Sequence, residues 1–111
     1  MRWTIVYFDA DVQTTIDALP AGLRARFLHL IQRMQTFGPH LGRPHTRPLG
    51  NGLFELRMKS KEGIARVFFG ILSGERIMLL HAFVKKSEKT PARELQTARK
   101  RLKEAIRNEN A

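Results

Sequence analysis

Cationic side chains recur through the second half of the chain, with aromatic rings between them. To bind single-stranded RNA, a protein needs cations that neutralise the phosphates and, beside them, aromatic rings on which the bases stack. An arginine also offers two parallel donors to one phosphate group. The residues that fit this chemistry are Arg57, Lys59, Arg66, Phe68, His81, Phe83, Lys85 and Lys86. The alternative is a solvated sheet face whose charges only keep the protein soluble.

The sequence lacks the residues for most other kinds of catalysis. It contains no cysteine, which excludes disulfides, thiolate metal sites and thiol nucleophiles. His40 and His45 lie in a segment rich in Gly and Pro without acidic neighbours, so we interpret them as loop residues and expect no metal site. The cluster 50–52 precedes a predicted strand rather than a helix, which excludes a phosphate-binding glycine loop. Any catalysis is therefore expected to use cations, without a metal or cofactor.

The charge balance favours a polyanionic partner. Among 111 residues, 20 Lys and Arg stand against 10 Asp and Glu, giving a net charge of +10. Most of the excess lies in residues 51–111, and such a field attracts nucleic acid or an acidic protein. No apolar run is long enough for a membrane span, and the N-terminus turns acidic too early for a secretory signal. We therefore expect a cytoplasmic protein that does not enter a membrane.

The elements that carry these cations follow from the periodicity of apolar residues. Residues 20–37 repeat at helical spacing, and a second long helix opens at Thr90. Residues 38–52 are interpreted as a loop, because they hold four Gly and three Pro. Strands are predicted over residues 3–8, 53–59, 64–72 and 76–84. The prediction is one α+β domain over residues 1–111, with the order β-α-α-β-β-β-α and a curved antiparallel sheet covered on one face by helices.

The alternation within the strands separates an apolar face from a charged face. Leu56 and Met58 are expected to face the helices, while Arg57 and Lys59 point away from them. In the next strand Arg66 and Phe68 share the open face, and in the third strand so do His81, Phe83 and Lys85, while Met78, Leu80, Ala82 and Val84 face the helices. Because Arg66 is expected on the surface, its replacement should change stability by less than about 0.5 kcal/mol.

Three blocks of the sequence, GLFELR, ARVFF and LLHAFVKKSEKTP, lie within residues 49–101. Together they resemble the RelE/ParE toxin superfamily, and within it the phage-related, HigB-like branch. The resemblance implies a toxin of a type II toxin–antitoxin pair that enters the ribosome and cuts mRNA. It also implies an antitoxin partner with a helix-turn-helix domain. The residues that the resemblance implies in catalysis are Arg57, Lys59, Arg66 and Lys86. The RNA-binding set expected from the open face and from the third block is Phe68, His81, Phe83, Lys85 and Lys89.

The implied chemistry is attack of a ribose 2′-OH on the adjacent phosphate, without a metal. This step needs a base, an acid and stabilisation of the phosphorane. Lysines among other cations are candidates for the proton transfers, and His81 and Glu55 are rivals; Glu55 also fits a structural pair with Arg57 or Arg66 across the sheet. Two other functions stay open, a ParE-like inhibitor of DNA gyrase and an RNA- or protein-binding module without catalysis. Ala65 stands where many relatives carry Tyr, and Tyr7 is the only tyrosine.

Overall fold

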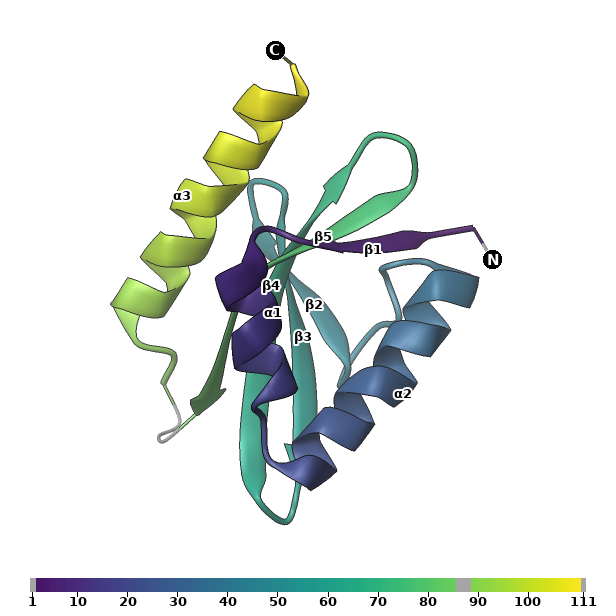
Figure 1. The fold of residues 1–111 in the computed structure, drawn as a ribbon, viewed down its shortest axis with the longest axis vertical. Helices are drawn as coiled ribbons and strands as arrows, with labels where there is room; N and C mark the ends of the chain where they lie inside the picture. The colour runs from purple at the N-terminus through teal and green to yellow at the C-terminus, as the bar shows by residue number, and fades with distance from the viewer. Residues whose placement is uncertain (1, 86–88, 111) are drawn as a thin grey trace.

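A five-stranded sheet with three helices forms the fold (Figure 1). The computed structural model describes residues 2–85 and 89–110. The elements in chain order are β1 (Thr4–Tyr7), α1 (Ala10–Asp17), α2 (Ala21–Phe37), β2 (Thr46–Gly50), β3 (Leu53–Ser60), β4 (Gly63–Leu72), β5 (Arg76–Lys85) and α3 (Ala92–Glu109). No helix within the described residues has both the length and the apolar character to cross a membrane. The predicted α+β class is confirmed.

The strands follow the order β1-β5-β4-β3-β2 across the sheet. β1 pairs with β5 in parallel, and all other pairs are antiparallel. β2 is a strand that the sequence reading missed, since residues 38–52 were interpreted as one loop. Pro48 lies in β2 and cannot donate to a ladder, but β2 is an edge strand where one such gap is tolerated. The Gly and Pro content of this segment is therefore compatible with a short edge strand, although it suggested a loop.

Helices α1 and α2 cover one face of the sheet. Asp9 caps α1, because its carboxylate accepts a hydrogen bond from the backbone N–H of Val12 at 3.0 Å. α2 ends at Gly38, whose φ of 97° favours glycine. The core on this face joins both helices to β3, β4 and β5, through buried residues that include Ile16, Leu23, Phe27, Leu30, Leu56, Met58, Val67, Phe69 and Leu79.

Helix α3 packs on the opposite face of the sheet, so the prediction of helices on one face alone is wrong (Figure 1). A second core holds it there, built from Leu53, Phe68, Leu80, Ala98 and Leu102. Gly70 of β4 makes room for the helix, since a Cβ at this position would lie 2.6 Å from Cδ1 of Leu102. Apolar residues on both faces of β4 and β5 thus bind two helical layers, and the sheet has one layer on each side.

A β-bulge in β5 explains why the third strand was assigned to the wrong faces. Phe68 pairs with His81 and Phe69 pairs with Leu79, so Leu80 is the extra residue. Met78 and Leu80 therefore contact the α3 core, and not the core under α1 and α2 as predicted. Beyond the bulge the prediction holds, because Ala82 and Val84 belong to the α1/α2 core and Phe83 packs on the α3 side.

Candidate functional site

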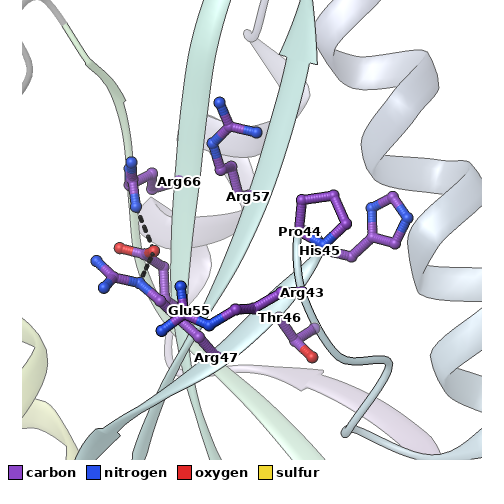
Figure 2. A pocket seen from close by; sticks show the side chains of 8 residues that line it. All are labelled: Arg43, Pro44, His45, Thr46, Arg47, Glu55, Arg57 and Arg66. Carbon is purple, nitrogen blue, oxygen red and sulfur yellow. Dashed lines mark hydrogen bonds and ion pairs between the residues drawn. The ribbon is translucent and has the colours of Figure 1, made fainter.

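α3 covers only part of its face of the sheet, and a pocket of about 390 Å³ opens beside it. Strands β2, β3 and β4 form its floor, and the segment before β2 forms one wall (Figure 2). The pocket is strongly cationic, because four of the eight residues that line it are arginines. The lining consists of Arg43, Pro44, His45, Thr46, Arg47, Glu55, Arg57 and Arg66.

Glu55 stands at the centre of this pocket between two arginines. Its Oε1 accepts hydrogen bonds from Nη1 of Arg66 and, at 2.8 Å, from Nε of Arg47 (Figure 2). Glu55 is 1% exposed and Arg66 is 9% exposed. The hydrogen bond to Glu55 raises the pKa of Arg47 above its usual value. The expectation that Arg66 is a surface residue is therefore wrong, because its guanidinium is buried in an ion pair that crosses from β4 to β3.

Several nitrogen atoms of the pocket are left for a ligand. Nε of Arg66 and Oε2 of Glu55 are buried and lack a hydrogen-bond partner among the described residues. Within residues 2–85 and 89–110, the guanidinium groups of Arg43 and Arg57 also have no hydrogen-bond or ion-pair partner. A buried donor without an acceptor is costly, so such a group favours binding of an acceptor from outside. The arrangement is suited to hold an anion with planar, two-pronged contacts.

His45 contributes to the wall of the pocket through its backbone more than through its ring. Its carbonyl oxygen accepts a hydrogen bond from the backbone N–H of Arg57 at 2.8 Å, which ties the segment before β2 to β3. Its ring points away from the arginines (Figure 2). Burial lowers the pKa of His45, and the nearby charges of Arg33 and Arg26 and the ring of His29 lower it further.

Of the residues predicted to act in catalysis, the structure brings Arg57 and Arg66 together. They are direct cross-strand partners in the β3–β4 ladder and both line the pocket. Lys59 instead lines a separate hollow of about 270 Å³, together with Arg26 and His29 of α2. Lys86 lies outside the described residues. Two of the four predicted catalytic side chains therefore share one site.

The residues predicted to stack on RNA lie mostly under α3. Phe68 is 1% exposed and belongs to the α3 core, so the expectation of an open ring is wrong. Phe83 is partly exposed and packs against the Phe68 ring, with 5.5 Å between the ring centroids. His81 is held by Glu94 of α3, with 2.6 Å between Nε2 and Oε1. α3 thus occupies the part of this face on which these rings had been expected to meet RNA.

Two more lysines of the predicted RNA-binding set flank this region. Lys85 is partly exposed at the end of β5, where it pairs with Ile64 of β4. Lys89 is exposed and precedes α3. Both make contacts within the protein. Neither lines the arginine pocket.

Sequence reasoning missed the part of the site contributed by Arg43 and Arg47. Both lie in the segment interpreted as a loop, where Gly and Pro masked the edge strand β2. The signal that could have found them is the pair of arginines at 43 and 47, which continues the charge of β3 in a segment without acids. Within the described residues, no three side chains of His, Asp or Glu come together as metal ligands.

A comparison with family models decides the classification. Residues 14–103 match the model of the family "Phage derived protein Gp49-like (DUF891)". The chain belongs to this family. The match includes α2, the whole arginine pocket and most of α3. Membership agrees with the phage-related, HigB-like branch that the three sequence blocks indicated. No curated protein sequence matches the chain.

Two solved structures share the fold of this Gp49-like protein. A mutant of the Escherichia coli toxin RelE in the free state, with two arginines replaced by alanine, superposes with a TM-score of 0.66 at 9% identity, covering 91% of this chain and 98% of that one. An archaeal RelE–RelB complex from Pyrococcus horikoshii OT3 gives a TM-score of 0.57 at 17% identity, covering 78% and 98%. The fold is therefore that of the RelE toxins.

Proposed function

We propose that this protein is the toxin of a type II toxin–antitoxin pair and cuts mRNA on the ribosome. One observation carries the proposal, namely the pocket in which four arginines converge on the uncovered half of the sheet. Partly buried arginines without a full set of partners suit a phosphate, because charge-assisted hydrogen bonds to it are strong. The RelE-like fold and the Gp49-like family give the proposal its reaction class.

In the proposed step, a ribose 2′-OH attacks the adjacent phosphorus and the bond to the 5′-oxygen breaks. The products are a 2′,3′-cyclic phosphate and a 5′-OH. Arg57 and Arg66 face the phosphate, and their charges stabilise the phosphorane that forms during attack. We assign the proton transfers to Lys85 and Lys86, as expected from the sequence, and contact with the RNA backbone to Lys89. Lys85 lies at the end of β5, outside the arginine pocket, so the bound RNA must extend beyond the pocket to reach it. In this proposal the guanidinium groups supply the charge stabilisation that a metal would otherwise give, so the step is written without a metal.

The proposed partners are the ribosome with its mRNA and a cognate antitoxin. A groove along α3 suits the antitoxin, because Ile106 provides apolar surface beside the buried Leu102, and Arg99, Lys100 and Lys103 surround it with charge. Ile106 is 44% exposed. An acidic amphipathic segment would complement this groove. The antitoxin is expected to carry a helix-turn-helix domain, and the toxin to act in the cytoplasm where its ribosomes are.

The test is induction of the protein in cells without its antitoxin, followed by pulse labelling and mapping of RNA ends. We expect amino-acid incorporation to stop first, and new mRNA ends to carry a 5′-OH. Ends with a 5′-phosphate and a 3′-OH would contradict the proposed chemistry, since they require attack by water. An early loss of DNA supercoiling with normal incorporation would instead favour a gyrase inhibitor. RNA binding without any cleavage would favour the non-catalytic module.

A further inference from the structure

Glu55 is the one acid among the described residues that line the arginine pocket. Its negative charge weakens the binding of an anion in this pocket, because a carboxylate repels a phosphate. Its burial also carries a cost, since a charge removed from water must be compensated by partners. With 1% exposure it is more deeply buried than any of the arginines around it. A negative charge at the centre of an anion site needs a role that offsets this penalty.

The contacts of Glu55 show what it does to its neighbours. Its Oε1 accepts from Nη1 of Arg66 on β4 and from Nε of Arg47 on β2, so one oxygen joins the two strands that flank β3. Each arginine is held by a single nitrogen. Nε of Arg66 remains unpaired although it is buried, and the terminal nitrogens of Arg47 remain unpaired among the described residues. Glu55 thus contacts both guanidinium groups, and their other nitrogens are left without a hydrogen-bond partner among the described residues.

We propose that Glu55 is a positioning residue that holds the guanidinium groups of Arg66 and Arg47 in the orientation that receives the phosphate of the RNA. This inference rests on the proposed function for its substrate. Glu55 itself does not touch the RNA and acts through the two arginines. Long cationic side chains lose much rotational freedom when they bind, and a partner that fixes them beforehand removes that cost from the reaction.

The proposal predicts that the affinity for RNA rises and the rate of cleavage falls when Glu55 is replaced by Gln. Replacing Glu55 by Gln keeps the shape but removes a negative charge, so the pocket attracts RNA more strongly while its arginines are held less firmly. A residue that only stabilises the fold would lower both quantities together. Glu55→Asp separates the two effects, because it keeps the charge and shortens the side chain by one methylene group.

The first measurement concerns the arginine itself and needs no RNA. In ¹⁵N-labelled protein, the terminal nitrogens of a fixed guanidinium give separate signals, whereas free rotation merges them. We expect separate signals for Arg66 in the wild type, assigned by their absence in Arg66→Lys, and merged signals in Glu55→Gln and Glu55→Asp. Merged signals in the wild type, or separate signals in both variants, would overturn the positioning role.

The second measurement compares cleavage with binding. Single-turnover cleavage on programmed ribosomes should fall by about 10- to 100-fold in Glu55→Gln and in Glu55→Asp, as expected when a reacting group loses its alignment. Affinity for an RNA oligonucleotide blocked by 2′-O-methyl groups should rise by about threefold in Glu55→Gln at low salt and stay unchanged in Glu55→Asp. Glu104→Gln on the exposed side of α3 makes the same change in net charge and is the matched control. It should leave cleavage unchanged.

The outcomes distinguish this proposal from the proposed function. Absence of cleavage by the wild type, with the expected Arg66 signals, refutes the nuclease and leaves the positioning role intact. Wild-type cleavage with an unchanged rate in both Glu55 variants refutes the positioning role alone. A parallel loss of melting temperature, affinity and cleavage in Glu55→Asp also refutes it, since that result assigns Glu55 to the fold.

Discussion

The two halves of the α3 side of the sheet share strands β3 and β4, but one half is covered by a helix and the other is open. On one half, Phe68 and Leu80 lie under α3 in a second core. On the other half, two residues earlier in β4, Arg66 lies in the open arginine pocket. The alternation of side chains between the two faces of the sheet continues along β4 through both halves. What differs is whether a helix covers them, so the boundary of α3 separates a structural surface from a candidate site.

Phe68→Ala tests the covered half and should have the largest effect on stability. Removal of a ring that is 1% exposed leaves a cavity under α3, and such changes cost about 3–5 kcal/mol. Urea unfolding of the purified protein measures this loss. The control is Phe37→Ala, at a ring that is 75% exposed, which should leave stability nearly unchanged. Normal stability of Phe68→Ala with weakened RNA binding would show that this half is open after all.

Arg66→Ala tests whether the open half is also structural. Its removal leaves the buried carboxylate of Glu55 with Arg47 as its remaining partner, and breaking a buried ion pair costs about 3 kcal/mol or more. We expect the midpoint of unfolding to fall accordingly, well beyond the small change expected from the sequence. The double variant Arg66→Ala with Glu55→Ala should recover part of the loss, because the uncompensated charge is gone. Strictly additive effects of the two substitutions would contradict the pair.

Arg57→Ala is the sharper test of catalysis in the open half. The Arg57 guanidinium is partly exposed and has no partner among the described residues, so its removal should change stability by less than about 0.5 kcal/mol. Loss of one group that stabilises the transition state costs about 10² in rate, or about 2.7 kcal/mol. Growth after induction and single-turnover cleavage measure the effect. Arg24→Ala on the exposed surface of α2 is the matched control, and full toxicity of Arg57→Ala would remove the pocket from the mechanism.

The smallest expected effect concerns the wall of the pocket and its response to pH. Burial, with the charges of Arg33 and Arg26, lowers the pKa of His45 in the folded state. Below pH about 6.5 the unfolded chain therefore binds a proton that the folded chain does not, and stability falls as the pH decreases through this window. His45→Gln should reduce the difference in melting temperature between pH 7.5 and pH 5.5. An equal difference in the variant would contradict the assignment.

Local patterns were enough to predict the parts of the site that lie within one hairpin. Strict alternation in β3 and β4 places Arg57 and Arg66 on one face, and antiparallel pairing then makes them neighbours. The same logic failed in β5, because almost every residue there is apolar and a bulge shifts the faces. It also missed β2, because Pro48 and the glycines around it resemble a loop. Alternation therefore assigns the faces only in strands that contain both polar and apolar residues.

The order of residues along the chain is enough to establish the α+β class, the net charge of +10 and the two arginines that face away from α1 and α2. These features follow from residue type and from spacing along one chain segment. In contrast, the packing of α3 over Phe68 and the burial of Glu55 between Arg47 and Arg66 become visible only in the folded chain. The physical reason is that burial depends on which distant segment packs on a face. The alternation of residues along a strand predicts two faces. Which part of each face is exposed to solvent depends on the helices and strands that pack against it.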